Sequence, residues 1–500
     1  MHRRGVLAAA FAAGVGVAVP ALAQDAKPDA PKLDLAKIDL PKLPPDASVK
    51  QTTRVAGKTL AYTATVGVIP VRDEKGKVAA EVVFTAYILD GAKGPNRPIT
   101  FAFNGGPGAA SVYLNLGAIG PKRLQFGAQG DSPSDPPNLT DNSATWLDFT
   151  DLVFIDPVGA GFSRSLVPMD ETKKRFFGVK EDVAYLSRVV YDWLLKNQRM
   201  ASLKYVVGES YGGLRAPAIG HYLQRTLGVA PAGIVMVSPV IDYRARGHTD
   251  LSPLAYMITL PSMAAARYER EGKPLNAETL AEVEAYARGE FVTDMLKGQS
   301  DPAAVSRIVE RVTRYTGLDP ALVRRMGGRI DTPTFLKELY RDQGRIASIY
   351  DANVTAYDPF PWAQTRRAGD PILDSIVAST TTAMVDFTTR TVGWKVDGRY
   401  NALSDEVNDN WANRSQAESV EDLRQALAAD PKLKALIAHG YGDLSCPFFA
   451  SRLIVDQMPR DAGAARVTLA LYPGGHMFYS RPGSMGSFRG DVMKLYGVAA

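Results

Sequence analysis

The 500-residue chain contains one cysteine and only five histidines. A single cysteine excludes an intramolecular disulfide, and it also excludes any zinc site that needs two thiolates. The 58 Lys and Arg residues exceed the 53 Asp and Glu residues by five and form no basic block, so we expect no nucleic-acid partner. Charged residues make up 22% and hydrophobic residues 46% of the chain. These are ordinary values for globular proteins and exclude a disordered or coiled-coil chain.

Residues 1–23 have the pattern of a secretory signal peptide. Two arginines precede an apolar stretch from Val6 to Val19, and Ala21-Leu22-Ala23 provides a small-x-small cleavage pattern. An apolar run of about 14 residues is too short to span a bilayer, which favours a cleaved signal over an anchor. We therefore predict an exported protein, periplasmic or secreted, that is cleaved after Ala23 and then has no membrane span. The adjacent arginines leave the general and twin-arginine export routes both open.

Strands and helices are expected to alternate along much of the mature chain. Residues 24–50 are rich in Pro, Lys, Asp and Ala and predict a disordered linker. The expected strands that follow are 59–69, 81–89, 98–103, 152–155, 205–207 and 234–237, and the expected helices are 179–196 and 216–227. Such alternation implies a parallel sheet covered by helices on both faces.

The segment 241–430 has a different character, with mostly helical patterns rich in Ala, Glu and Arg. The strand and helix pattern then resumes at 433–438, 448–458 and 466–471. Because the sheet is interrupted and later completed, the sequence favours a helical cap inserted into one core over a separate domain. The predicted core comprises residues 51–240 and 431–500.

Gly208-Glu209-Ser210-Tyr211-Gly212 has the Gly-x-Ser-x-Gly form and lies between an expected strand and an expected helix. In a nucleophile elbow the serine occupies a sharp strand-to-helix turn, and the two glycines avoid clashes there. The motif alone is weak in a chain with 44 glycines, and a glycine-rich turn with a solvated serine is the alternative. The surrounding strand and helix favour Ser210 as a nucleophile.

A nucleophilic serine needs a base, and the histidines can be compared by position. His476 lies in a glycine loop after the last expected strand, which fits the chain order Ser, Asp/Glu, His of hydrolases with this elbow. The other histidines lie in the signal peptide, on the helix after the elbow, in the insertion and at a strand end: His2, His221, His248 and His439. His476 is therefore the predicted base.

Asp443 is the one carboxylate between the strand at 433–438 and the following helix. It would hold the imidazole tautomer and stabilise the imidazolium. Capping of that helix is the alternative role.

The loop Asn104-Gly105-Gly106-Pro107-Gly108 follows an early strand, where such hydrolases place an oxyanion donor. Glycine lets a backbone N–H approach a substrate without an intervening Cβ. The expected donors are the N–H groups of Gly106 and Tyr211, and a plain tight turn is the alternative.

Four blocks together resemble the serine carboxypeptidase family (peptidase family S10). They are the Asn-Gly-Gly-Pro-Gly loop, the elbow, the Asp-Pro-Val-Gly-Ala-Gly-Phe-Ser run at 156–163 and the Gly-His-Met at 475–477. The resemblance runs from Tyr62 to Ser484 and is nearest to bacterial members. It implies an α/β-hydrolase fold whose large helical cap separates the nucleophile half from the Asp/His half. It also implies an exopeptidase that removes single residues from peptide C-termini.

The resemblance further implies that Asn104 and Glu209 bind the terminal carboxylate of a peptide, with Gly105 also binding substrate. A glutamate that faces a carboxylate must share a proton with it, because two negative charges at hydrogen-bond distance do not persist. We therefore expect activity on peptides with a free C-terminal carboxylate to be greatest at acidic pH. A solvated Glu209 on the turn is the alternative.

The sequence departs from eukaryotic members of the family at three places. Ala109 replaces the usual disulfide cysteine, Ala102 replaces a tryptophan, and the acid loop at 440–443 keeps only its second aspartate. Cys446 and Met477 match positions that in some members lie beside the pocket of the leaving residue. Ordinary core packing is the alternative for both.

Two other function classes stay open. An esterase or an acyltransferase would use the same acyl-serine chemistry, although retention of both Asn104 and Glu209 favours peptide C-termini. A binding protein on a hydrolase scaffold would have lost part of the triad. Because no metal or nucleotide motif accompanies the triad, we expect no cofactor and no metal.

Overall fold

The computed structural model describes residues 41–92, 97–125, 133–247, 251–459 and 463–498. The predicted signal peptide and the first part of the predicted linker lie outside these residues. Within them, none of the helices is long and apolar enough to cross a membrane.

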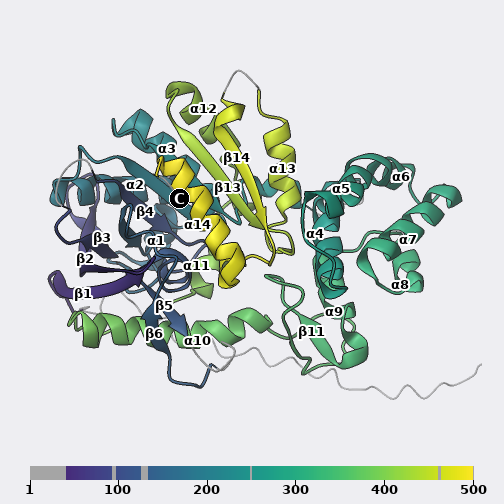
Figure 1. The fold of residues 1–500 in the computed structure, drawn as a ribbon, viewed down its shortest axis with the longest axis horizontal. Helices are drawn as coiled ribbons and strands as arrows, with labels where there is room; N and C mark the ends of the chain where they lie inside the picture. The colour runs from purple at the N-terminus through teal and green to yellow at the C-terminus, as the bar shows by residue number, and fades with distance from the viewer. Residues whose placement is uncertain (1–40, 93–96, 126–132, 248–250, 460–462, 499–500) are drawn as a thin grey trace, which may run out of the picture.

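A mixed ten-stranded sheet forms the centre of the described structure (Figure 1). Its order is β1-β2-β3-β7-β4-β9-β10-β13-β14, with β8 paired to β3. The first three strands pair antiparallel, and the strands from β7 to β14 in this order are all parallel. The strands of this sheet are β1 (Ala47–Val55), β2 (Lys58–Arg72), β3 (Val78–Leu89), β4 (Ile99–Phe103), β7 (Asp151–Ile155), β8 (Arg164–Ser165), β9 (Lys204–Glu209), β10 (Gly233–Val237), β13 (Lys434–Gly440) and β14 (Val467–Tyr472).

The α-helices are α1 (Met169–Phe176), α2 (Val179–Lys196), α3 (Tyr211–Thr226), α4 (Leu254–Arg270), α5 (Ala277–Tyr286), α6 (Val292–Lys297), α7 (Pro302–Thr316), α8 (Pro320–Arg325), α9 (Thr332–Glu338), α10 (Pro371–Asp386), α11 (Asp405–Asp409), α12 (Val420–Ala429), α13 (Phe448–Asp456) and α14 (Pro482–Tyr496). Among the described residues, nine α-helices, α4 to α12, lie between β10 and β13. Two small hairpins add β5 (Lys122–Gln125) with β6 (Asn138–Asp141), and β11 (Arg345–Ala347) with β12 (Thr355–Tyr357).

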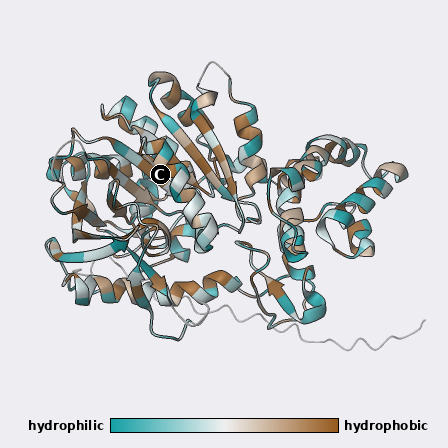
Figure 2. Cartoon of the chain, in the orientation of Figure 1, coloured by the Kyte–Doolittle hydropathy of each residue, from teal (hydrophilic) through white to brown (hydrophobic). Residues whose placement is uncertain are grey.

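Successive side chains of the central strands face two different cores, as the period of two in a strand requires. In β4, Phe101 and Phe103 join the core formed with α2, α3 and α12, whereas Ala102 joins the core formed with α10 and α14. Figure 2 shows the hydrophobic residues concentrated along the central strands. Burial on both faces explains why these strands are continuous apolar runs, and it confirms the predicted α/β fold. The predicted parallel pairing holds from β7 to β14, whereas β1, β2 and β3 are antiparallel.

The predicted disordered linker is wrong for its last residues, because β1 begins at Ala47. β1 pairs along its whole length with β2, from Ala47 opposite Val66 to Val55 opposite Lys58. Its side chains alternate between inward and exposed positions, but most of the inward ones are small or polar. The alternation therefore lacked the hydrophobic signal that identifies most strands.

The predicted cap at 241–430 is larger than the cap in the structure. Helices α4 to α9 share a separate hydrophobic core that continues onto Phe448 of α13. By contrast, Met384 of α10 and Leu423 of α12 belong to the two cores of the sheet. Figure 1 shows α5 to α8 set apart from the sheet, and α10 running beside β5 and β6. Residues 371–430 are therefore part of the hydrolase core, because helical composition alone does not show which body a helix packs against.

Candidate active site

Ser210 lies on a sharp turn between β9 and α3, as the elbow motif predicts. Its backbone has φ 61° and ψ −121°, a conformation that is strained for a residue with a side chain. A Cβ added at Gly208 would lie 1.7 Å from the carbonyl oxygen of Gly212, and one added at Gly212 would lie 2.4 Å from the carbonyl oxygen of Phe103. Both glycines are therefore needed for the turn to pack against itself and against β4.

His476 and Asp443 form a buried pair at the carboxyl ends of β13 and β14. Nδ1 of His476 lies 2.7 Å from Oδ2 of Asp443, and the backbone N–H of Cys446 donates to Oδ1 of Asp443 at 2.8 Å. Ser238 Oγ donates to the carbonyl oxygen of His476 at 2.7 Å, which fixes the histidine loop from β10. Because α13 begins only at Phe448, Asp443 orients the imidazole rather than capping that helix.

Two opposing effects act on the protonation of His476. Burial by itself lowers the pKa of the imidazole, but the neighbouring Asp443 and Cys446 raise it, and the net shift is well upward. With Nδ1 engaged by Asp443, Nε2 is the ring nitrogen left for proton transfer. The pair has the partners and burial that a serine hydrolase needs for its acid and base.

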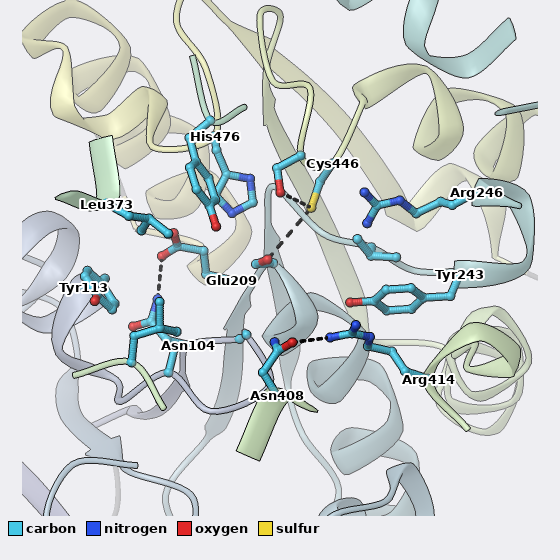
Figure 3. Close-up of a pocket in the computed structure, with 18 of the residues that line it drawn as sticks. Asn104, Tyr113, Glu209, Tyr243, Arg246, Leu373, Asn408, Arg414, Cys446 and His476 are labelled. Carbon is cyan, nitrogen blue, oxygen red and sulfur yellow. Dashed lines mark hydrogen bonds between the residues drawn. The ribbon is translucent and has the colours of Figure 1, made fainter. Parts of the chain in front are cut away.

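Ser210, His476 and Cys446 line one cavity of about 730 Å³ (Figure 3). The recorded contact of Ser210 Oγ is with Sγ of Cys446, at 3.9 Å. Within the part of the chain that the structure describes, Ser210 has no hydrogen bond to His476, a bond that hydrolases often tighten only when substrate binds. Asp443, Cys446 and His476 each have a side-chain atom of a kind that can bind a metal ion, and these three atoms lie within 4.8 Å of one another. However, the side chains of Asp443 and His476 are already engaged in a hydrogen bond with each other.

Asn104 and Glu209 form a buried polar pair beside the nucleophile. Nδ2 of Asn104 donates to Oε2 of Glu209 at 2.9 Å, and Oδ1 of Asn104 accepts from the backbone N–H of Leu114 at 2.9 Å. The hydroxyl of Tyr479 donates to both carboxyl oxygens of Glu209, at 2.9 and 3.0 Å. These contacts fix the amide orientation and leave one of its two hydrogens for a ligand.

Burial raises the pKa of Glu209 above its ordinary value, and the nearby Asp443 adds to the rise. His476, Tyr479 and Asn104 lower the pKa without cancelling the effect of burial. Only 2% of the Glu209 surface is exposed, which excludes the alternative of a solvated residue on the turn. A carboxyl group in this state holds its proton to higher pH than usual, so it can donate a hydrogen bond to a second carboxylate.

A buried ion pair between Arg215 and Asp182 holds the loop that carries Asn104. Arg215 of α3 donates to the carbonyl oxygen of Asn104 at 2.6 Å and to Oδ2 of Asp182 of α2 at 2.6 Å. A Cβ added at Gly105 would lie 2.5 Å from the backbone nitrogen of Tyr211, so the loop packs directly against the start of α3. The predicted oxyanion donors, Gly106 and Tyr211, thus belong to segments in contact, and their role stays a prediction.

Sequence reasoning missed several residues of the cavity and its surroundings. Tyr113 and Tyr350 line it, and Tyr479 holds Glu209. On the side of the cavity away from Asn104 lie the side chains of Arg246 and Arg414 (Figure 3). Of these residues, only Tyr479 carried a usable signal, since it follows the Gly-His-Met run closely. The others come from elements that reach the site only through tertiary packing.

Known proteins share both the sequence and the fold of this region. Residues 80–231 match the family model for serine carboxypeptidase. Serine carboxypeptidase-like 9 of Arabidopsis thaliana is 29% identical over 166 residues, which are 32% of this chain and 36% of that protein. Serine carboxypeptidase-like 8 of the same plant is 30% identical over 160 residues, which are 31% of this chain and 35% of that protein. The matches span only about a third of the length of these curated relatives.

A solved structure supports the fold over most of the chain. The crystal structure of Kex1(Δ)p, a prohormone-processing carboxypeptidase from Saccharomyces cerevisiae, superposes with a TM-score of 0.54 at 18% identity. The alignment covers 87% of this chain and 91% of the yeast chain. It shows a shared α/β-hydrolase fold. Residues 80–231, which contain the Asn104 loop and the Ser210 elbow, thus resemble serine carboxypeptidases in sequence, within a chain that has this fold.

Proposed function

We propose that this protein is a serine carboxypeptidase that releases single residues from the C-termini of peptides. The observation that carries the proposal is the buried pair of Asn104 and Glu209 directly beside Ser210. This pair offers an amide hydrogen and a protonated carboxyl group to a terminal carboxylate. A peptide held there by its end would place its last peptide bond at the nucleophile.

The proposed reaction passes through an acyl-enzyme. His476 accepts the proton of Ser210 as Oγ attacks the last peptide carbonyl, and the N–H groups of Gly106 and Tyr211 stabilise the oxyanion. The protonated imidazole, stabilised by Asp443, then gives its proton to the departing amino group, and the C-terminal residue leaves. Water, deprotonated by His476, releases the acyl peptide and restores the serine.

Cys446 and Met477 are proposed to line the substrate site, as their positions on the cavity wall support. Figure 3 shows Cys446 on the side of the cavity where Arg246 lies, and Asn104 on the opposite side, beside Glu209. We therefore place Cys446 next to the acyl part of the substrate, rather than beside the leaving residue. At 3% exposure, the thiol also contributes to core packing.

An esterase or acyltransferase with the same triad is the second candidate. Neither activity needs a buried protonated carboxyl group beside the nucleophile, which is why the peptidase is preferred. We also propose that the protein is exported, periplasmic or secreted, because residues 1–23 have the order of charge, apolar run and small residues found in signals.

The proposal is tested with protein purified from the exported fraction, whose mass should correspond to cleavage after Ala23. Peptides with a free or an amidated C-terminus are incubated at pH 4 to 8 and followed by mass spectrometry. We expect residues to leave singly from free C-termini and amidated peptides to react far more slowly. Ser210→Ala should lower the rate at least about 10³-fold, whereas Ser300→Ala, at an exposed cap serine, should not change it.

Equal rates on free and amidated peptides would favour the esterase candidate. Release of internal fragments, or no reaction with any peptide, would contradict the carboxypeptidase proposal.

A further inference from the structure

The walls of the cavity carry opposite kinds of charge on its two sides, and Ser210 lies next to Glu209 in the chain with its Oγ 3.9 Å from Sγ of Cys446. Asn104 and Glu209 lie on one side, and Arg246 and Arg414 lie on the other (Figure 3). Apart from Glu209, Asp405 is the only carboxylate among the described residues that line the cavity, and it is exposed at the start of α11. The wall opposite Glu209 is therefore cationic.

Neither Arg246 nor Arg414 has a carboxylate partner within the described ranges of the chain. Their neighbour Arg244 differs, because it pairs with Asp242 at 2.7 Å and lies 3.8 Å from Glu418. Two half-buried guanidinium groups thus line the cavity without a carboxylate partner among the described residues. Their free charge is available to a ligand.

Both arginines are positioned by contacts rather than left to move freely. Nη1 of Arg414 donates to Oδ1 of Asn408 at 2.9 Å, and Nδ2 of Asn408 donates to the carbonyl oxygen of Pro107 at 3.2 Å. This chain ties Arg414 to the loop that carries the predicted oxyanion donor. The guanidinium carbon of Arg246 lies 5.7 Å from the centre of the Tyr243 ring, at the cation–π distance.

The direction of a bound peptide follows from the position of the carboxylate pair. The last peptide carbonyl, which Ser210 attacks, and the terminal carboxylate are separated by one residue, the leaving residue. The leaving residue must therefore lie between Ser210 and the pair formed by Asn104 and Glu209. The residue that precedes the cleaved bond then extends to the opposite side of Ser210. There it faces Arg246 and Arg414.

We propose that Arg246 and Arg414 form a cationic subsite that binds an acidic side chain on the residue preceding the cleaved bond. The subsite makes this enzyme a carboxypeptidase that prefers peptides with Asp or Glu at the penultimate position. This inference rests on the proposed function, and its test is arranged so that the two can fail separately.

The test compares N-blocked dipeptides Glu-Leu, Gln-Leu and Lys-Leu at pH 6, where a glutamate side chain with a pKa of about 4.3 is ionised. We expect kcat/KM to be roughly five- to tenfold higher for Glu-Leu than for Gln-Leu, and lowest for Lys-Leu. Salt at about 0.5 M should reduce the Glu-to-Gln ratio and leave the Gln-Leu rate nearly unchanged, because ions screen this attraction.

Variants locate the effect at the two arginines. Arg246→Gln and Arg414→Gln should each reduce the Glu-to-Gln ratio to about two, and the double variant should reduce it to about one. The Gln-Leu rate reports that each variant is folded. Arg324→Gln, at an exposed cap arginine, removes the same charge and should leave the ratio unchanged. Arg246→Glu should make Lys-Leu a better substrate than Glu-Leu.

A wild-type ratio near one with active enzyme would overturn the subsite while leaving the carboxypeptidase proposal intact. A ratio that neither arginine variant changes would overturn it too. If the wild type cleaved none of the dipeptides, the proposed function itself would fail. The wild-type ratio and its response to salt test the subsite even where a variant folds poorly.

Discussion

Glu209 is a buried carboxyl group that would meet a second carboxylate whenever a peptide binds as proposed. Its raised pKa means that the protonated form extends to higher pH than in a free glutamate. Only that form can donate to the substrate carboxylate, so binding weakens as pH rises through the pKa of Glu209. The raised pKa of His476 acts in the other direction, because a protonated imidazole cannot act as a base.

The first residue-scale prediction concerns Glu209→Gln. The amide keeps a hydrogen-bond donor but does not titrate, so the fall of kcat/KM on the alkaline side should be lost while the acidic limb set by His476 stays. At low pH the variant should lose about tenfold in kcat/KM, since a neutral amide replaces a shared proton. The measurement is kcat/KM from pH 4 to 8 on one N-blocked dipeptide.

Glu278→Gln, at an exposed cap position, is the control and should keep the wild-type profile. A Glu209→Gln profile identical to that of the wild type would show that Glu209 does not share a proton with the substrate.

At this scale the sequence predicted the residues that lie within contiguous motifs. Ser210, Glu209 and Asn104 are each flanked by glycines whose spacing has a steric reason, which the added-Cβ distances bear out. Arg215 and Arg246 could not be found in this way. An arginine on a helix or turn normally lies in solvent, and nothing local distinguishes one that is buried beneath a loop or aimed into a cavity.

At the scale of elements, the start of α3 shows why local propensity was an incomplete guide. The sequence predicted a helix from residue 216, but α3 begins at Tyr211. Gly212, Gly213 and Pro217 all disfavour a helix on propensity alone. Here packing decides, because a Cβ at Gly213 would lie 2.2 Å from Cβ of Pro239. The glycines allow the first turn to approach β4 and the segment that follows β10.

The element-scale prediction is that Gly212→Ala lowers the free energy of unfolding by about 2–4 kcal/mol and abolishes most activity. The new Cβ would lie 2.4 Å from a backbone oxygen of β4, which cannot move without shifting the elbow. Urea denaturation and the dipeptide assay measure the two effects.

Gly490→Ala in α14 is the matched control. An added Cβ there meets nothing within 4 Å, so the helix should gain about 0.5–1 kcal/mol. Equal stability effects of the two substitutions would contradict the packing argument for the elbow.

At the scale of the whole molecule, the positions of most core strands along the chain were predictable, whereas their order in the sheet and the extent of the cap were not. Strand runs buried on both faces are visible in a sequence, because they are continuously apolar. The division of 241–430 into a cap and a set of core helices depends on long-range contacts such as those of Met384 and Leu423. No local pattern records these contacts.

The cap is connected to His476, the proposed catalytic base, through a partly buried network. The carbonyl oxygen of Tyr350, in the hairpin between β11 and β12, accepts from the backbone N–H of His476, and the two rings meet edge-on at 5.2 Å. Arg481 then joins Glu269 of α4 to Asp351, with a 2.7 Å bond to Oδ2 of Asp351. The cap thus positions the histidine loop, and Arg481 acts through that loop rather than on substrate.

The whole-molecule prediction is that Arg481→Gln loosens this connection. Amide exchange in the β11–β12 hairpin should become faster, and kcat/KM should fall about tenfold, because His476 is less well held. Glu269→Gln should do the same to a smaller extent, and the double variant should be no worse than Arg481→Gln, as expected for partners in one network.

Arg267→Gln is the control. It breaks bonds within the cap only, to Glu271 and to the carbonyl oxygen of Thr313, so it should leave kcat/KM unchanged. Strictly additive effects of the Arg481 and Glu269 variants would show that the cap does not hold the histidine through this pair.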